Sequence, residues 1–261
     1  MTTTILDRIL EAKRARIAEA KRSVSPELLL DMVKSLSPHN GHRFRNALAR
    51  EDRLNVIAEF KRASPSKGKI NNSLDPAKTA VAYEAGGASA ISVLTEEDFF
   101  DGSIDDLKAV RRSVDLPILR KDFIVDEYQI YESALAGADA VLLIAFALTS
   151  ESLENFQRLA ASLGLDAIVE VHDLDEIEKA AGIGAKIIGV NNRNLKTFEV
   201  SLDVSRELIR YRPKGALMIA ESGLSCHEDL SELHKLGFNG FLVGETLMKA
   251  SDQAEALRAL L

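Results

Sequence analysis

The sequence predicts a single α/β domain, a (β/α)8 TIM barrel over residues 1–261 that includes an N-terminal helical extension over residues 1–50. Short apolar runs alternate with amphipathic stretches eight times, and four of these units share a glycine between the helix and the apolar run. The chain has 261 residues. Alternating strands and helices are typical of a parallel sheet, and eight units in about 250 residues are typical of this barrel.

The apolar runs are short and rich in Val, Ile and Leu, as expected for parallel strands that are covered on both faces. They predict strands at 55–60, 90–94, 117–121, 139–144, 166–171, 186–191, 216–221 and 239–243. Helical patterns lie between them at 75–86, 104–113, 126–136, 150–163, 173–182, 203–210 and 226–236, with a last helix near 245–258.

The clearest internal repeat is a helix end, a glycine, a small or polar residue and an apolar run. It occurs in EAGGASAISVL (84–94), LAGADAVLLI (135–144), AGIGAKIIGV (181–190) and LGFNGFLVG (236–244). Glycine suits this position because the residue after a helix often adopts a left-handed conformation. A doubly wound open sheet is the rival architecture, but its usual phosphate-binding motif G-x-G-x-x-G is missing from the sequence.

The first 50 residues are expected to pack on the barrel, because they are too few for an independent domain of normal size. Helices are predicted at 4–22, 26–35 and 43–49, punctuated by Pro26 and Pro38. In the first stretch the apolar residues fall mostly at helical spacing, which indicates an amphipathic helix.

Composition and charge limit the classes of function. The net charge of −7 argues against nucleic acid or an anionic membrane surface as a partner. The only cysteine, Cys226, excludes internal disulfides and a multi-cysteine metal site. No apolar run approaches the roughly 20 residues that span a bilayer. We therefore expect a cytoplasmic protein, a monomer, that binds any anionic ligand through a local positive cluster.

Five of the predicted strands end in ionisable or amide side chains. Residues two apart in a strand share a face, and in such a barrel the carboxyl ends of the strands surround the reaction site. The side chains expected to converge there are Glu59, Lys61, Lys121, Glu170, Asn191 and Glu221. Lysines and glutamates in a half-buried rim would compensate one another and spread each other's pKa values, as acid–base catalysis requires.

Glycines after the last two strands predict a phosphate site. Strand seven runs into ESG (221–223) and strand eight into VGET (243–246), the loops that commonly bind phosphate in these barrels. Ser64 and Ser222 could add hydroxyl donors. The long segment 62–74 is expected to be a lid or binding loop.

The histidines do not predict a metal site, because no pair has a ligand spacing such as H-E-x-x-H. His172 is the one histidine beside a predicted rim residue, and we expect it to face away from Glu170. Ser222 lies in ESG rather than in G-x-S-x-G, so it is not expected to be a nucleophile. No cofactor is expected.

Eight segments resemble the successive landmarks of the indole-3-glycerol phosphate synthase family: IAEFKRASPSKG, SVLTEEDFFDGS, LRKDFIVDEYQI, GADAVLLI, IVEVHD, GVNNRNL, IAESGL and FLVGETLM. The resemblance covers essentially the whole chain, and its first and third segments are the most specific. It implies a reaction of tryptophan biosynthesis. In that reaction 1-(2-carboxyphenylamino)-1-deoxyribulose 5-phosphate closes a ring, loses carbon dioxide and is dehydrated to indole-3-glycerol phosphate.

The resemblance also implies catalytic roles. Lys121 would be the general acid at the substrate carbonyl, and Glu170 the acid–base partner in the dehydration. Lys61 would pair with the substrate carboxylate or assist proton transfer, and Glu59 would orient and tune the lysines.

Further residues would bind the substrate. Asn191 and Glu221 would hold the ribulose hydroxyls and the leaving group, and Arg193 would help bind the anionic substrate. The phosphate end would be formed by Ser64, Ser222, Gly223, Gly244 and Glu245. The wall against the anthranilate ring would be formed by Phe100, Phe123 and Leu142. Because a carboxylate repels phosphate, we expect the Glu245 side chain to turn outward while backbone N–H groups bind.

Two alternatives stay open at this point. Phosphoribosylanthranilate isomerase has a similar fold, but its acid–base pair is a cysteine and an aspartate, whereas Cys226 follows strand seven and the first strand ends in E-F-K. A non-catalytic binder of a phosphorylated ligand would keep the phosphate loops and lose the rim acids and bases.

Overall fold

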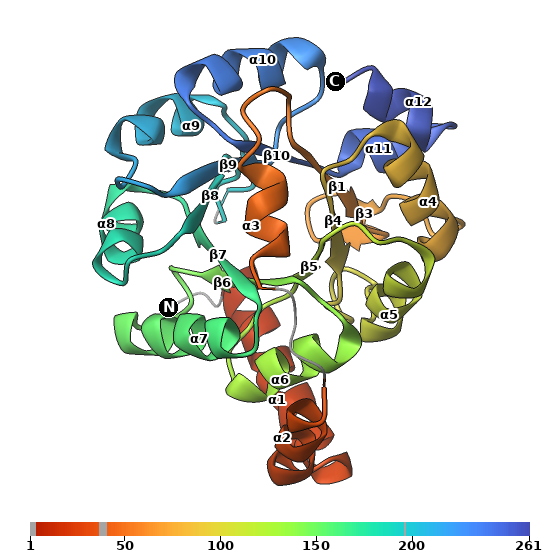
Figure 1. The fold of residues 1–261 in the computed structure, drawn as a ribbon, viewed down its shortest axis with the longest axis vertical. Coiled ribbons are helices and arrows are strands. Elements are labelled where there is room, and N and C mark those ends of the chain that lie inside the picture. Colours follow the sequence, from red (N-terminus) through yellow and green to blue (C-terminus); the bar gives the residue numbers. More distant parts are fainter. Residues whose placement is uncertain (1–3, 37–40, 196) are drawn as a thin grey trace.

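The computed structural model describes residues 4–36, 41–195 and 197–261, and Pro38 lies outside them. Its centre is a closed barrel of eight parallel strands (Figure 1). In chain order they are β1 (Val56–Phe60), β4 (Ala90–Leu94), β5 (Ile118–Lys121), β6 (Ala140–Ile144), β7 (Asp166–Val171), β8 (Ile187–Asn191), β9 (Leu217–Glu221) and β10 (Gly240–Val243). Because β1 pairs with both β4 and β10, the ring is closed, and the predicted fold class is confirmed.

The helices lie outside the strands (Figure 1). They are α4 (Pro76–Gly86), α5 (Ile104–Ser113), α6 (Glu127–Ala136), α7 (Ser150–Ser162), α8 (Leu174–Gly182), α9 (Asp203–Leu208), α10 (His227–Leu236), α11 (Glu245–Lys249) and α12 (Gln253–Arg258). The repeated glycine ends three of them: Gly87, Gly137 and Gly237 follow α4, α6 and α10 with positive φ. A side chain would be strained there, which explains the repeat.

Three local features differ from the predictions. The helix expected over 245–258 is two helices, because Ala250 is extended and the Asp252 carboxylate accepts from the Glu255 N–H, which starts α12 separately. The segment 62–74 contains a small hairpin of β2 (Ala63–Ser64) and β3 (Gly68–Lys69). A 3-10 turn over Ile209–Tyr211 follows α9.

Helix α3 (Arg43–Leu48) closes the end of the barrel where the strands begin (Figure 1). Its Phe44 and Leu48 are fully buried in the cluster that fills the barrel interior. The Asn55 amide, just before β1, donates to the carbonyls of Leu48 and Asn239, which ties α3 to two strands. Helix α3 does not cover the opposite end of the barrel, where the strands finish.

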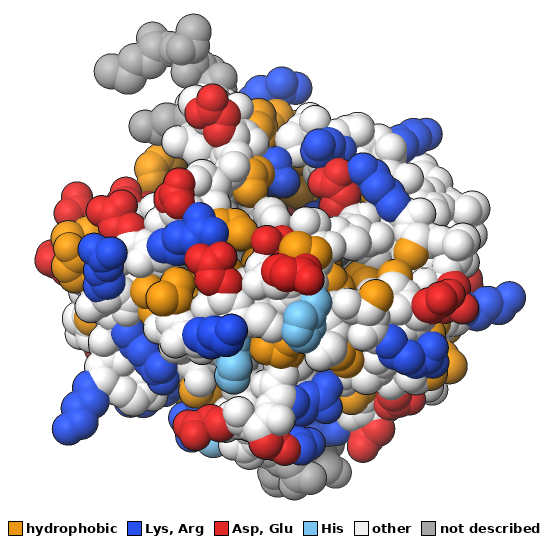
Figure 2. All heavy atoms as spheres, turned by 90° about the horizontal axis from the view of Figure 1, so that it is seen from above, with side chains coloured by type: hydrophobic (Ala, Val, Ile, Leu, Met, Phe, Trp, Pro, Cys, Tyr) orange, Lys and Arg blue, Asp and Glu red, His pale blue; other side chains and the backbone are white. Residues whose placement is uncertain are grey.

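Helices α1 (Ile5–Ser23) and α2 (Pro26–Lys34) pack beside α6 (Figure 1). Ile17, Leu29 and Tyr128 form one buried cluster, and the Tyr128 hydroxyl donates to the carbonyl of Ala20 at 3.3 Å. Among the described residues, no helix combines the length and apolar character needed to cross a membrane. On the face shown in Figure 2, acidic and basic side chains are interspersed.

Candidate active site

The six side chains predicted at the strand ends line one cavity at the open end of the barrel. The Lys121 ammonium lies 2.9 Å from Glu170 Oε2 and 2.9 Å from Glu221 Oε2. Lys61 Nζ lies 2.5 Å from Glu59 Oε1. The three glutamates are almost completely buried, with 1–3% of each residue exposed. Strands β1, β5, β7 and β9 thus deliver two ammonium groups and three carboxylates to one small site.

The backbone makes room for these carboxylates at two glycines. A Cβ on Gly189, in β8 beside both glutamate strands, would lie 2.1 Å from Glu221 Oε1. A Cβ on Gly244, just after β10, would lie 2.4 Å from Glu59 Oε1. Real Cβ contacts are never that short, so glycine at both positions is a requirement of the site's geometry.

The pKa values of the two glutamates beside Lys121 are shifted in opposite directions. Burial raises the pKa of Glu221, and the negative charges of Glu170 and Glu59 raise it further, against the effect of Lys121. Burial also favours the neutral form of Glu170, but Lys121, His172 and Asn191 outweigh it, so its pKa is lowered. For Lys121 burial opposes the charge, yet the three glutamates raise the pKa of its ammonium. The site therefore holds an ammonium, a stable carboxylate and a carboxyl that takes a proton readily.

The residues predicted for the phosphate end lie around the same cavity. Ser222 and Gly223 both have positive φ, at 66° and 83°, in the turn after β9. The Glu245 carboxylate is turned toward Lys249 Nζ, at 2.6 Å, and lies 3.7 Å from Lys67 Nζ. It still borders the cavity, so it is neutralised by neighbours rather than turned fully away.

Part of the cavity lining is an apolar wall. The rings of Phe100 and Phe123 are 6.0 Å apart and, with Leu142, line the cavity as expected. Leu6 and Ile9 of α1 also line it, and the sequence analysis did not assign them to the site. In the sequence these two residues belong to the apolar stripe of the first helix, and such a stripe normally indicates a helix face packed on the core rather than a binding site. Arg193 lines the cavity too, and its guanidinium donates to the Phe198 carbonyl at 3.3 Å.

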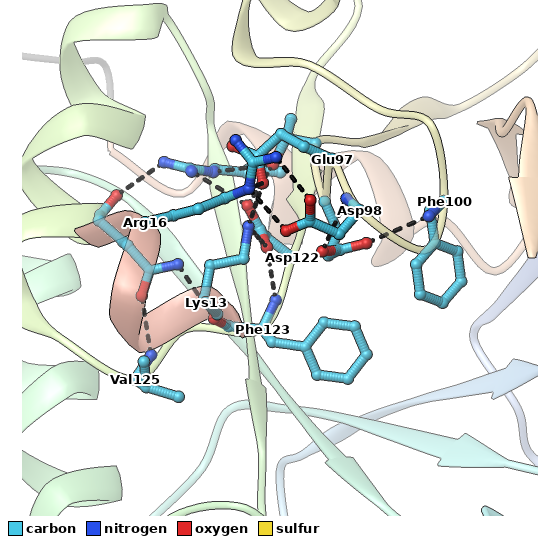
Figure 3. Close-up of polar contacts among 12 residues, drawn as sticks. Lys13, Arg16, Glu97, Asp98, Phe100, Asp122, Phe123 and Val125 are labelled. Atoms are coloured by element: carbon cyan, nitrogen blue, oxygen red, sulfur yellow. Dashed lines mark hydrogen bonds and ion pairs between the residues drawn. The ribbon is translucent and has the colours of Figure 1, made fainter. Parts of the chain in front are cut away.

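A buried ion-pair network that the sequence analysis missed fastens α1 to the rim (Figure 3). Lys13, only 2% exposed, lies 2.7 Å from Glu97 Oε2 and 2.9 Å from Asp122 Oδ1. The Phe123 N–H donates to the same Asp122 oxygen at 2.8 Å. Asp122 directly follows Lys121, so α1 supports both the ammonium and the aromatic wall.

The expectation that His172 faces away from Glu170 is wrong. His172 Nε2 lies 3.4 Å from Glu170 Oε1, and its Nδ1 lies 3.1 Å from Glu176 Oε2. The two positions are two residues apart at the end of β7, and residues so spaced share a face. No cluster of three or more metal-ligating side chains occurs in the part of the chain that the structure describes.

A barrel whose strand ends gather two lysines and three buried glutamates beside an apolar wall is the architecture of an acid–base enzyme. The family model for indole-3-glycerol phosphate synthase matches residues 6–260. The chain belongs to the indole-3-glycerol phosphate synthase family, which confirms the resemblance.

Individual relatives in the comparison carry the same family name. The indole-3-glycerol phosphate synthase of Carboxydothermus hydrogenoformans is 46% identical over 264 residues, which cover 98% of this chain and 99% of that one. The protein of the same name from Chlorobium luteolum is 47% identical over 250 residues, 95% of each chain. Among solved structures, a thiamine phosphate pyrophosphorylase from Pyrococcus furiosus has a TM-score of 0.61 at 19% identity, covering 83% of this chain and 95% of its own. That likeness shows the fold alone.

Proposed function

We propose that the rim cluster of this chain converts 1-(2-carboxyphenylamino)-1-deoxy-D-ribulose 5-phosphate to indole-3-glycerol phosphate, carbon dioxide and water. This is a carboxy-lyase reaction of tryptophan biosynthesis. The observation that carries the assignment of roles is the placement of one buried ammonium, that of Lys121, between the carboxylates of Glu170 and Glu221, each at 2.9 Å. Family membership supports the reaction itself.

Proton transfer follows from the protonation states of this cluster. The aromatic carbon attacks the substrate carbonyl, whose oxygen needs a proton, and the Lys121 ammonium in the cavity offers one. Dehydration later needs a base, and Glu170, whose pKa is lowered, is ionised to serve as one. Glu221 takes a proton more readily because its pKa is raised, so it can donate a hydrogen bond to a ribulose hydroxyl or the leaving group, together with Asn191.

Binding of the substrate's anionic groups falls to the cations at the edges of the cavity. Lys61, oriented by Glu59 at 2.5 Å, pairs with the anthranilate carboxylate, and Arg193 adds a second positive charge. The anthranilate ring packs against Phe100, Phe123 and Leu142. The phosphate is bound at another end of the cavity. The serines Ser64 and Ser222 offer hydroxyl groups, and Gly223, Gly244 and Glu245 offer backbone N–H groups.

A single assay tests the reaction. The purified chain, mixed with the synthetic carboxyphenylamino-deoxyribulose phosphate, is expected to produce indole fluorescence without added metal or nucleotide. Phosphoribosylanthranilate serves as the control substrate, because turnover of that compound would support the isomerase instead. Tight binding of the carboxyphenylamino compound without any indole product would support a non-catalytic binder.

Replacing Glu245 with glutamine is expected to lower the KM for the phosphorylated substrate by up to about fivefold and to leave kcat unchanged. The change removes a carboxylate from the phosphate end and frees Lys249 and Lys67, and a partly exposed charge interaction is worth up to about 1 kcal/mol. Initial rates over a range of substrate concentrations measure both constants. Glu154→Gln, which breaks a comparable pair with Arg158 on α7, is the matched control. An unchanged or higher KM in Glu245→Gln alone would contradict the placement of the phosphate.

We further propose that the chain is one domain, acts as a monomer and works in the cytoplasm. A single free cysteine, Cys226, suits a reducing compartment. Packing of α1 and α2 on α6 supports one domain. Sedimentation equilibrium tests the oligomeric state, and a mass of twice 28.5 kDa would contradict it.

A further inference from the structure

His172 lies between two buried carboxylates that come from its own segment of the chain. Its Nε2 is 3.4 Å from Glu170 Oε1 and its Nδ1 is 3.1 Å from Glu176 Oε2. The backbone N–H of His172 donates to the same Glu176 oxygen at 2.8 Å, which fixes the position of that carboxylate at the start of α8. The ring is therefore held on both sides, and one side is a predicted catalytic group.

The two partners determine the charge of the ring. An ionised carboxylate oxygen only accepts hydrogen bonds, and a neutral imidazole has one donor nitrogen and one acceptor nitrogen. A neutral ring would turn a lone pair toward one of the two carboxylates. The imidazolium donates from Nδ1 to Glu176 and attracts Glu170 through Nε2 at an ion-pair distance of 3.4 Å, without a hydrogen bond there. The geometry thus favours the cation.

The carboxylate of Glu170 consequently lies between two cations. Lys121 Nζ is 2.9 Å from its Oε2, and His172 is on its Oε1. Once Lys121 has given its proton to the substrate, the ammonium no longer holds this carboxylate. A second cation at the other oxygen preserves both the charge and the orientation of the base.

We propose that His172 is a positioning residue for this reaction, which acts as an imidazolium to keep Glu170 ionised and in place. The proposal rests on the proposed function, because it takes Glu170 as the acid–base partner. It assigns a task to a side chain that touches the base rather than the substrate.

The other charged groups around His172 agree with this role. Glu221 faces it from β9, and Asp173 and Arg193 line the same pocket as His172. Burial lowers the pKa of the His172 ring, but Glu176, Glu170 and Glu221 together raise it above the ordinary value. A raised pKa means that the ring keeps its proton to higher pH than a free histidine, and that the charge is lost only as pH rises through this value.

The pH dependence of turnover tests the proposal. A base works only above its pKa, and an opposite charge within about 6 Å lowers a carboxyl pKa by roughly 1–3 units. In His172→Gln the acidic limb of kcat is therefore expected to move to higher pH by about one unit or more. His234→Gln, on α10, is the matched control and should leave the limb in place. An acidic limb at the wild-type position in folded His172→Gln would overturn the proposal.

A second readout does not need activity. The ring nitrogens of His172, followed by NMR as pH is varied, should report a pKa above the ordinary value of a histidine, and this pKa should fall in both Glu176→Gln and Glu170→Gln. A neutral His172 ring at pH 6 in the wild type would overturn the proposal even if His172→Gln failed to fold. If the wild type forms no indole product, the proposed function fails, while the NMR response to Glu170→Gln still decides whether the two side chains are coupled.

Discussion

Replacement of Lys121 by alanine is expected to lower kcat by about 100- to 10,000-fold, the range that loss of a positioned general acid produces. The variant removes the proton donor and also the cation between Glu170 and Glu221. Without the ammonium the pKa of Glu170 rises, so this carboxylate also becomes a less available base near neutral pH. Indole fluorescence under saturating substrate measures the loss.

The matched control is Lys214→Ala, which removes an exposed lysine before β9. It should leave kcat unchanged, and far-ultraviolet circular dichroism should show that both variants keep the fold. A decrease of less than about fivefold in Lys121→Ala would remove this lysine from the role of general acid, because no general acid step is worth so little.

Gly189→Ala is expected to reduce kcat by about 100-fold. The added methyl would lie 2.1 Å from Glu221 Oε1 and 3.2 Å from Ile168 Cγ2, so the carboxylate must leave the position in which its other oxygen lies 2.9 Å from Lys121 Nζ. A displacement of about 1 Å within a catalytic group can cost about 100-fold in rate. Steady-state kinetics measure the change, and substrate protection against thermal unfolding shows whether binding survives.

Gly182→Ala provides the comparison, because a Cβ at the end of α8 meets nothing within 4 Å. This variant should be as active as the wild type and as stable or slightly more so. Full activity in Gly189→Ala would show that the Glu221 carboxylate tolerates displacement, and its assignment to the ribulose hydroxyls would have to be abandoned.

Much of the fold could be predicted because its signals are local. Short continuous apolar runs, helical spacing and a glycine after the helix end are each contained within about ten residues, and the strands are within one residue of their predicted bounds. Glu59, Lys121 and Glu221 could be placed at one rim because the fold itself brings parallel strand ends together.

The other features of the fold and the site depend on contacts between residues far apart in the sequence or on details of helix capping, which a short sequence pattern does not indicate. Lys13 on an apolar helix face is indistinguishable in the sequence from a solvated lysine, and only the fold brings it to Asp122. The break between α11 and α12 depends on whether Asp252 caps a new helix, which local propensity leaves undecided. For His172 the sequence does contain the needed information, because residues two apart along an extended chain share a face, which brings its ring to Glu170.

The ion pairs between α1 and the rim have a consequence for folding during translation of the chain. The Glu97 partner of Lys13 is 84 residues further along, and its second partner, Asp122, later still. During translation, α1 emerges from the ribosome before Glu97 and Asp122 have been synthesised, so it cannot dock and its apolar stripe stays exposed to solvent until then. Contacts of such long sequence separation slow folding and leave sticky surface accessible to chaperones.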